Sequence, residues 1–319
     1  MAQITNRATL ATALTTGLDQ IFTNRGKKLK KIWPGFLEKK KIEKGQWVDY
    51  DRAGFGFLVK TGEQEQVPYD QIEWGNVFTV TADTYELGFR ISRQAMDDML
   101  GGGYGVDLRQ IADLGAVTEQ FRDSANSTDE DLAAQLVLLS NSATATSKWL
   151  GAGRDGVALA GTHTLLKNGA GTFANNMTAA ALNYYQLLSA YTTLVTSKSD
   201  EGFYSVPPEG VDLIVGTYNQ HRAYELVKTT KGKPDSNENT ATAMSAIDWN
   251  VVVDPWLGPT FKGWALRDKN RAKLYFIDRD GPLFENESDF DVKGMKFSVY
   301  QRRKVSFSSP YGYVFNAGA

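Results

Sequence analysis

The sequence feature that most restricts the fold is a long β-hairpin near the N-terminus that is not expected to be stable by itself. Aromatic and β-branched residues alternate in part with polar ones between residues 46 and 91, and Thr61-Gly62-Glu63 marks a turn. This pattern predicts a hairpin at 47–76. Its charged residues are Asp49, Asp51, Arg52, Lys60, Glu63, Glu65 and Asp70. Because a two-stranded hairpin is only marginally stable by itself in water, we expect this one to lie on another surface.

A second segment near the start of the chain is strongly basic. Residues 25–44 include only two acidic residues, Glu38 and Glu43, and nine basic ones: Arg25, Lys27, Lys28, Lys30, Lys31, Lys39, Lys40, Lys41 and Lys44. The net charge of the whole chain is −2, so the remainder is net acidic. Three interpretations stay open: a solvated arm, binding to nucleic-acid phosphates, and docking on acidic faces of neighbouring copies, which we favour.

Apolar residues at helical spacing predict two helices, one on each side of the hairpin. Residues 8–23 have the pattern of an amphipathic helix. A helix over 107–141 spans on the order of 50 Å if it is unbroken, at 1.5 Å per residue. The polar patch at 126–129 leaves a split open, with Thr128 as an N-cap. The acidic residues of this helix, on which a basic arm can dock, are Asp107, Asp113, Glu119, Asp123, Asp129, Glu130 and Asp131.

The second half of the chain alternates helices with short apolar strands. A helical face over 184–195 is followed by two short buried strands, at 213–215 and at 251–253. From Phe261 to the end the pattern is β. With 319 residues and a prior of ~150 residues per domain, we expect two compact regions of mixed α+β structure.

The composition excludes several classes of function. The chain has no cysteine, which removes disulfides, thiolate nucleophiles and cysteine metal sites. Its only histidines are His163 and His221, which leaves almost nothing to serve as an imidazole base. No run of about 18 apolar residues is present, so no segment is expected to span a membrane. The first residues lack the apolar block of a signal peptide, so we expect the protein to stay in the cytosol of the cell that makes it.

Three motifs match catalytic or metal-binding patterns only in part. Residues 151–156 fit G-x-G-x-x-G, but no strand precedes them, which favours a flexible connection. Residues 278–281 begin like a calcium loop, but Pro282 stands where a ligand is needed, which favours a β-turn. His163 has no second histidine nearby and no carboxylate at ligand spacing, which favours a hydrogen-bonded structural role, and His221 is expected at the surface. We therefore predict no catalytic, cofactor-binding or metal-binding residue and no enzymatic activity.

An ordered set of segments covers most of the chain. They are Tyr85–Ser92 with Asp97-Asp98, Asp155–Leu166, Asp212–Gly216, Val251–Leu257, Trp264–Asp268, Asp289-Phe290-Asp291 and Gln301-Arg302-Arg303-Lys304. Each segment is weak alone. In their order and spacing they resemble the major capsid proteins of tailed bacteriophages with the HK97-like fold, in particular the branch similar to the phage Mu-type major head subunit.

This resemblance implies an α+β, HK97-like capsid fold in four parts. The N-terminal arm is expected at 1–46 and the extended hairpin, or E-loop, at 47–76. The peripheral domain, with 107–141 as its long spine helix, is expected at 77–148 and 279–306. The axial domain is expected at 149–278 and 307–319.

The resemblance also implies a structural function. Copies of the chain would form hexamers and pentamers that tile an icosahedral head around double-stranded DNA, as a virion capsid assembled in the host cytoplasm. A separate scaffolding protein, a portal and a maturation protease are implied as partners, and no membrane is. Two alternatives stay open: an encapsulin-like compartment that houses protein cargo, and a soluble DNA-binding protein that uses its basic arm.

We expect the arm and the hairpin to supply the contacts between copies. The arm would clasp one neighbour through its charge and two aromatic side chains, and the hairpin would lie over another through main-chain and aromatic contacts. The residues predicted at these contacts are Trp33, Phe36, Lys39, Lys40, Lys41, Tyr50, Phe55 and Phe57.

Overall fold

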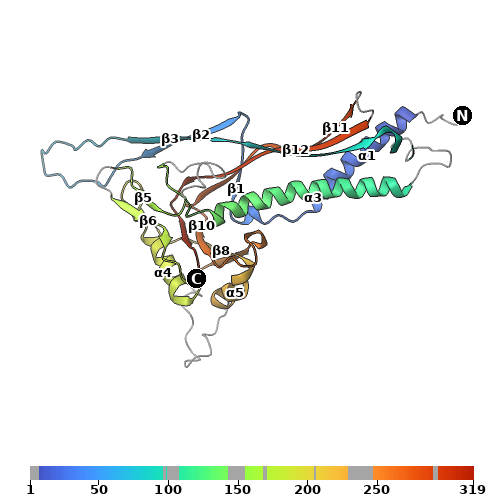
Figure 1. Cartoon of the computed structure of the whole chain (residues 1–319). Coiled ribbons are helices and arrows are strands. Elements are labelled where there is room, and N and C mark those ends of the chain that lie inside the picture. The colour runs from blue at the N-terminus through green and yellow to red at the C-terminus, as the bar shows by residue number, and fades with distance from the viewer. Residues whose placement is uncertain are drawn as a thin grey trace. The chain divides into compact units, whose positions relative to one another are not determined.

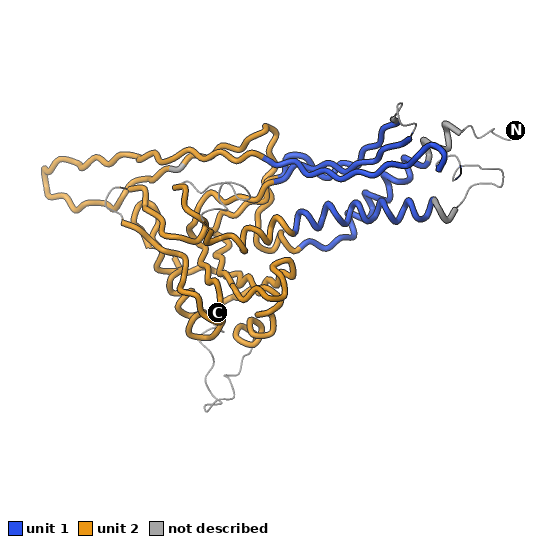
Figure 2. Tube along the Cα trace, in the orientation of Figure 1, with its two compact units in different colours: residues 1–31, 82–130, 278–303 blue, residues 32–81, 131–277, 304–319 orange. Residues whose placement is uncertain are grey.

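The chain divides into two compact units, each built from segments that are distant in the sequence (Figure 2). The computed structural model describes residues 7–95, 98, 108–142, 155–167, 171–204, 206–228, 247–289 and 294–319. Unit 1 comprises residues 1–31, 82–130 and 278–303, and unit 2 comprises residues 32–81, 131–277 and 304–319.

Unit 1 combines two helices with antiparallel strands. Its elements are α1 (Arg7–Lys28), β4 (Asp83–Ser92) and parts of α3 (Leu108–Leu138), β11 (Lys273–Asp289) and β12 (Gly294–Ser309). β4 pairs with β12 over its whole length, and both helices run beside these strands (Figure 1). Because side chains alternate across a strand, Phe89 and Phe297 share one face, where they form a core with Leu18 of α1 and Leu114 of α3.

The long helix α3 is continuous over 31 residues, about 46 Å at 1.5 Å per residue. Thr128 does not cap a new helix, because its hydroxyl donates to the carbonyl of Ser124 at 3.0 Å within the same helix. Asp129 is buried and pairs with Arg303 of β12, Oδ1 to Nε at 3.3 Å. The polar patch therefore serves a buried ion pair and does not split the helix.

The β-turn predicted at residues 278–281 is wrong, because these residues lie inside the 17-residue strand β11. Asp278 is buried there and pairs with Arg303 of β12. The turn signal of the local sequence is overridden by pairing with a strand and an ion partner that come later in the chain.

Unit 2 is centred on a five-stranded sheet with the strand order β7-β13-β10-β8-β9. The strands are β7 (Asn176–Met177), β8 (Val211–Val215), β9 (Trp249–Val253), β10 (Trp264–Asp268) and β13 (Tyr313–Asn316). β8 is buried along its whole length, which confirms the buried strand predicted at 213–215. It pairs parallel with β9, so the strand predicted at 251–253 is present, but only Val252 of these three residues is buried. The helices α4 (Tyr184–Thr196) and α5 (Gln220–Lys228) pack on one core with these strands, which includes Leu187, Leu226 and Trp264.

Unit 2 also contains the predicted hairpin. Its strands are β2 (Gln46–Ala53) and β3 (Glu73–Thr81), paired antiparallel from Gln46–Thr81 to Ala53–Glu73. Residues 54–72, which we call the tip, join them without further strand structure. The shorter elements of the unit are η1 (Trp33–Gly35), β1 (Glu38–Lys41), β5 (Thr162–Thr164), β6 (Thr172–Ala174), η3 (Thr217–Asn219) and η5 (Pro255–Leu257).

The division into units cuts across the expected four-part map. α3, β11 and β12 each contribute residues to both units, and the hairpin falls within unit 2. The assignment of arm, E-loop, peripheral and axial domains stays a prediction. Among the described residues, no helix combines the length and apolar character that a membrane crossing requires.

Candidate assembly surface

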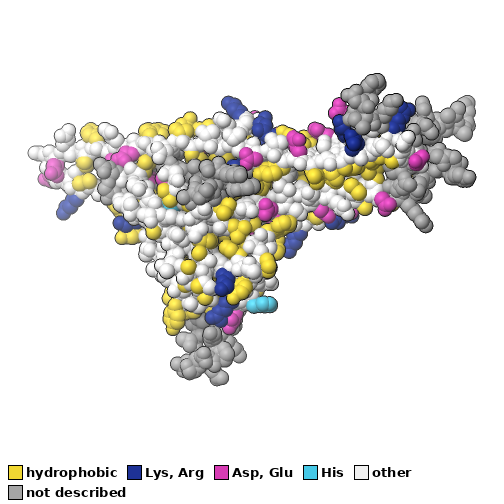
Figure 3. All heavy atoms as spheres, viewed as in Figure 1, with side chains coloured by type: hydrophobic (Ala, Val, Ile, Leu, Met, Phe, Trp, Pro, Cys, Tyr) yellow, Lys and Arg dark blue, Asp and Glu magenta, His cyan; other side chains and the backbone are white. Residues whose placement is uncertain are grey.

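Exposed apolar side chains are concentrated on the hairpin. Of the 19 large hydrophobic side chains exposed in the described part of the chain, 11 lie between residues 48 and 77. They are Val48, Tyr50, Phe55, Phe57, Leu58, Val59, Val67, Tyr69, Ile72, Trp74 and Val77. Figure 3 shows hydrophobic side chains along this hairpin. Because soluble monomers rarely expose large contiguous apolar areas, such a concentration marks an interaction surface.

Three of the residues predicted at inter-subunit contacts belong to this surface. Tyr50 is 63% exposed, Phe55 is 60% exposed and Phe57 is 70% exposed. Their side chains are therefore available to a second molecule. The contact with a neighbouring copy itself stays a prediction.

The root of the hairpin, in contrast to its tip, is anchored in unit 2. The Trp47 ring meets Phe78 and Tyr275 edge-on, with centroid distances of 5.3 and 5.1 Å. The Lys40 ammonium lies 3.8 Å from the centroid of the Trp47 ring. Burial lowers the pKa of Lys40, because it withdraws the ammonium from water. Lys40 is thus part of the root, and it is not a free charge of an arm.

The expectation for Trp33 and Phe36 is corrected by the structure. The Trp33 ring stacks on Phe276 of β11 at a centroid distance of 4.2 Å, and Phe36 is fully buried. Both side chains fill the core of their own chain, so neither is presented to a neighbour. Their partner strand lies far along the sequence, which is why the local pattern indicated a projecting arm.

The basic segment likewise makes contacts within the chain. Arg25 of α1 donates from Nε and Nη2 to the two carboxylate oxygens of Asp123 in α3, both at 2.7 Å. Docking of a basic residue on the acidic helix thus occurs inside one subunit, where we had favoured docking between copies. Lys39 and Lys41 are exposed on β1, and their predicted role between copies stays a prediction.

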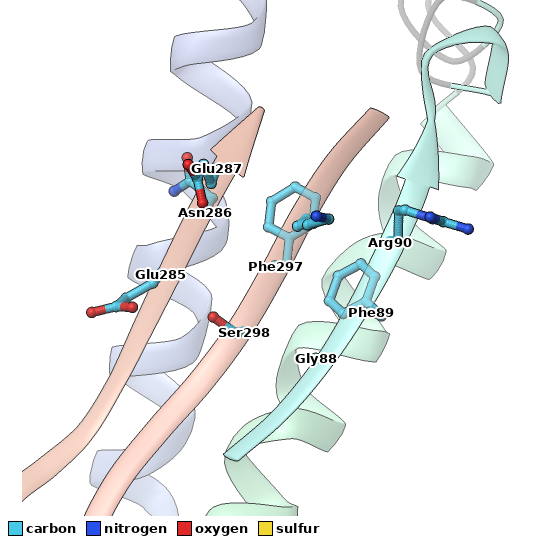
Figure 4. Close-up of a pocket in the computed structure, with 9 residues that line it drawn as sticks. Gly88, Phe89, Arg90, Glu285, Asn286, Glu287, Phe297 and Ser298 are labelled. Atoms are coloured by element: carbon cyan, nitrogen blue, oxygen red, sulfur yellow. The ribbon is translucent and has the colours of Figure 1, made fainter. Parts of the chain in front are cut away.

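A groove crosses the sheet of unit 1, with a volume of about 790 Å³. Figure 4 shows Glu285 and Glu287 of β11 on one border and Arg90 of β4 on the opposite border. Gly88 lies on β4, on the same border as Arg90, and a Cβ at this position would lie 3.2 Å from the carbonyl oxygen of Phe297. Lys296 and Ser298 of β12, the strand between β11 and β4, also line the groove. The groove therefore carries charges of both signs, an arrangement that suits an extended segment with charges of both signs.

His163 has the predicted structural role. It is fully buried, with Nδ1 2.7 Å from Asp155 Oδ2 and Nε2 3.3 Å from the carbonyl oxygen of Leu159. The sequence shows no carboxylate at metal-ligand spacing from His163, but it did not reveal that Asp155, eight residues earlier in the chain, is its hydrogen-bond partner. His221 is exposed, as predicted.

The other motifs add no catalytic or metal site within the part of the chain that the structure describes. Most of the glycine motif at 151–156 lies outside the described residues. Within the described ranges, no three histidine or acidic side chains are gathered as metal ligands. The features that remain as a functional surface are the exposed hairpin and the charged groove.

The comparison with family models identifies one family. A family model described as phage capsid protein matches residues 76–315. No curated protein matches the sequence.

Solved structures share the fold at low sequence identity. The structure of Microbacterium phage Oxtober96 has a TM-score of 0.52 and 12% identity, covering 91% of this chain and 92% of the other. The structure of Mycobacterium phage Adephagia has a TM-score of 0.52 and 10% identity, covering 92% and 91%. The capsid of an empty GTA particle has a TM-score of 0.52 and 10% identity, covering 91% of each chain.

The family match spans most of the sequence, and the mixed helices and strands of the structure have the HK97-like α+β architecture of these neighbours. The resemblance to the Mu-type branch stays a prediction, because the family match does not separate the branches. The chain therefore belongs to the phage capsid protein family, and it is a major capsid protein, a subunit of an icosahedral shell.

Proposed function

We propose that this capsid protein closes as hexamers and pentamers around double-stranded DNA, with the hairpin of each subunit lying over a neighbour. The single observation that carries the proposal is the gathering of 11 exposed large hydrophobic side chains on one hairpin. Their burial between copies would supply the main driving force, at about 25 cal/mol per Å² of apolar surface removed from water. Many such contacts, each modest and repeated by symmetry, close a shell.

The groove of unit 1 in a second copy is the receiver that best fits the tip. Lys60 precedes the turn of the tip and Glu65 follows it, so opposite charges flank this turn. The groove offers Glu285 on one border and Arg90 on the other. Complementary charges fix the register of two surfaces more than they add affinity, so we assign this role to the groove and the binding energy to the apolar side chains.

The proposed role is structural and needs no chemistry at a site. A separate scaffolding protein, a portal and a maturation protease are proposed as partners, because a shell must be started, filled and matured by other chains. Assembly is proposed in the host cytoplasm, and the final location is the virion capsid.

Replacing residues 55–71 by a short Gly-Ser turn tests the proposal. The root contacts of Trp47 remain in this variant, so the subunit is expected to keep its circular-dichroism spectrum and melting temperature while forming no shells in electron micrographs. Phe55→Leu with Tyr69→Phe keeps the apolar surface, and this matched variant is expected to assemble.

Closed shells of normal size from the shortened chain would refute the role of the hairpin. If the unaltered protein forms shells that carry a protein cargo and no DNA, the compartment is of the encapsulin-like kind, and the genome-enclosing part of the proposal fails.

A further inference from the structure

Both ends of the hairpin tip are held by one lysine from elsewhere in unit 2. The Lys167 ammonium donates to the carbonyl oxygen of Gly54 at 3.2 Å and forms an ion pair with the Asp70 carboxylate. Asp70 also accepts the Gly56 N–H at 2.7 Å. Lys167 is 16% exposed, so one mostly buried side chain bridges the two ends of the 54–72 segment.

A second turn of unit 2 holds the same end of the tip. Glu201 Oε1 accepts the Gly54 N–H at 2.9 Å. The Phe203 ring meets Phe57 edge-on, with a centroid distance of 4.6 Å. Gly202, with φ +88°, allows the turn that places Glu201 and Phe203 on either side of it. We call the contacts of Lys167, Glu201 and Phe203 with the tip the latch.

The latch holds main-chain groups and leaves the apolar surface free. It occupies the N–H and carbonyl of Gly54 and the N–H of Gly56. Phe57, the aromatic side chain of the tip that it contacts, is still 70% exposed, and Leu58 beside it is fully exposed. A device that blocked assembly would cover these side chains, so the geometry fits a device that positions them.

The electrostatics keep the latch closed over the ordinary pH range. Hydrogen bonds from the Gly56 N–H and from Lys167 lower the pKa of Asp70 to about 2. Burial acts to raise the pKa of Glu201, but the hydrogen bond from Gly54 and those from neighbouring groups outweigh it, so this pKa is lowered. Both carboxylates therefore remain charged acceptors at neutral pH.

We infer that Lys167 is a positioning residue that fixes the direction of the hairpin in the free subunit, so that two copies meet with the docking surface already formed. This inference rests on the proposed function of the hairpin. A loop that is ordered before association does not lose conformational entropy in the binding step, so binding is more favourable. A loop fixed in advance therefore assembles at a lower subunit concentration than a mobile one.

The test compares Lys167→Met with Lys228→Met in the full chain. Both changes remove one lysine charge, but Lys228 is exposed at the end of α5, outside the hairpin and the latch. In unassembled Lys167→Met, amide hydrogen exchange at residues 54–57 is expected to rise, with no change at β8. Its critical concentration for shell formation is expected to rise roughly 3- to 10-fold, the range for loss of a part-exposed charged hydrogen bond.

Two further results decide the inference. Lys167→Arg keeps the charge and the donors, and it is expected to restore most of the protection and of the assembly. If Lys167→Met exchanges like the unaltered chain at residues 54–57, or assembles at an equal or lower concentration, the positioning role is refuted. If the unaltered protein forms shells while Lys167→Met gives one of these results, the positioning role fails and the proposed function stands. The failure of the inference and the failure of the proposed function are therefore distinguishable.

Discussion

The ring of His163 stacks on Phe173, which in turn stacks on Tyr311, with centroid distances of 5.2 and 4.8 Å. The hydroxyl of Tyr311 donates to Asp200 Oδ1 at 2.7 Å. The two ring nitrogens of His163 lie near Asp155 Oδ2 and the carbonyl oxygen of Leu159. A row of stacked rings with a carboxylate at each end thus holds together segments far apart in the sequence.

The carboxylate of Asp155 makes the stability contributed by this row of rings depend on pH. Burial acts to raise the pKa of Asp155, but the hydrogen bond and the charge of His163 outweigh it, so the pKa is lowered. A carboxyl group whose pKa is lower in the folded chain than in the unfolded chain stabilises the fold at pH values above its unfolded pKa of about 3.9. This stabilisation is lost as the pH falls from there through the lower pKa of the folded chain.

We therefore expect Asp155→Asn to lower the free energy of unfolding at pH 7 by about 1.5–3 kcal/mol, the value of a hydrogen bond to a charged group. Below pH 4 the difference from the unaltered chain is expected to shrink, because the Asp155 carboxyl group is protonated first in the unfolded chain and only at lower pH in the folded one. Urea denaturation followed by circular dichroism at pH 7, 5 and 3.5 checks this. A difference that stays constant over this range would mean that the carboxylate charge contributes nothing.

Residue-level predictions succeeded where the local sequence carries the cause. His163 was expected in a hydrogen-bonded structural role, and the apolar runs indicated strands at 213–215 and 251–253. The failures all involve a distant partner. Trp33 stacks on Phe276, and Asp278 pairs with Arg303, and no spacing rule connects such positions.

Elements were predicted best where one pattern runs for many residues. The apolar stripe predicted α3, but the patch around Thr128 has the composition of a helix start as well as that of a helix interior. A buried partner, Arg303, decides between them. The basic segment was predicted as an arm that docks on acidic faces of neighbouring copies, yet its apolar residues anchor it in the core of its own chain.

The charge of Lys60 beside the turn of the tip allows a test of whether the tip of one copy binds the groove of another. Lys60→Glu in the tip, or Glu285→Lys with Glu287→Lys in the groove, is expected to raise the critical concentration for assembly by roughly 2- to 5-fold, as for an exposed ion pair. Combining all three changes restores opposite charges and is expected to recover assembly. Light scattering against subunit concentration measures each variant.

The combined variant is the decisive one in that series. If the combined variant assembles no better than the tip variant or the groove variant alone, the tip does not bind this groove. The hairpin would then have another receiver, while its apolar role would be unaffected.

At the scale of the whole molecule, the family could be predicted and the division into units could not. The order of weak segments along the chain indicated a capsid protein, and the family match confirms it. The expected peripheral domain, at 77–148 and 279–306, and the expected axial domain, at 149–278 and 307–319, are also discontinuous, and their bounds stay a prediction. The observed units share α3, β11 and β12, and a boundary inside one helix leaves no turn or linker signal to find.

Assembly through apolar side chains has a characteristic temperature dependence. Apolar burial is driven by entropy near 25 °C and weakens on cooling. We expect the critical concentration for shell formation to be lower at 25 °C than at 4 °C. Light scattering at both temperatures in one buffer measures it, and stronger assembly in the cold would show that polar contacts dominate the interface.

The exposed run from Phe55 to Val59 also has a consequence for a subunit that meets no partner. It contains no charge and no proline, and one glycine among aromatic and aliphatic residues. That composition favours stacking of identical strands into fibrils. We expect rapid overproduction of the chain to yield insoluble deposits, so that the pace of synthesis relative to particle growth sets how much of the protein is recovered intact.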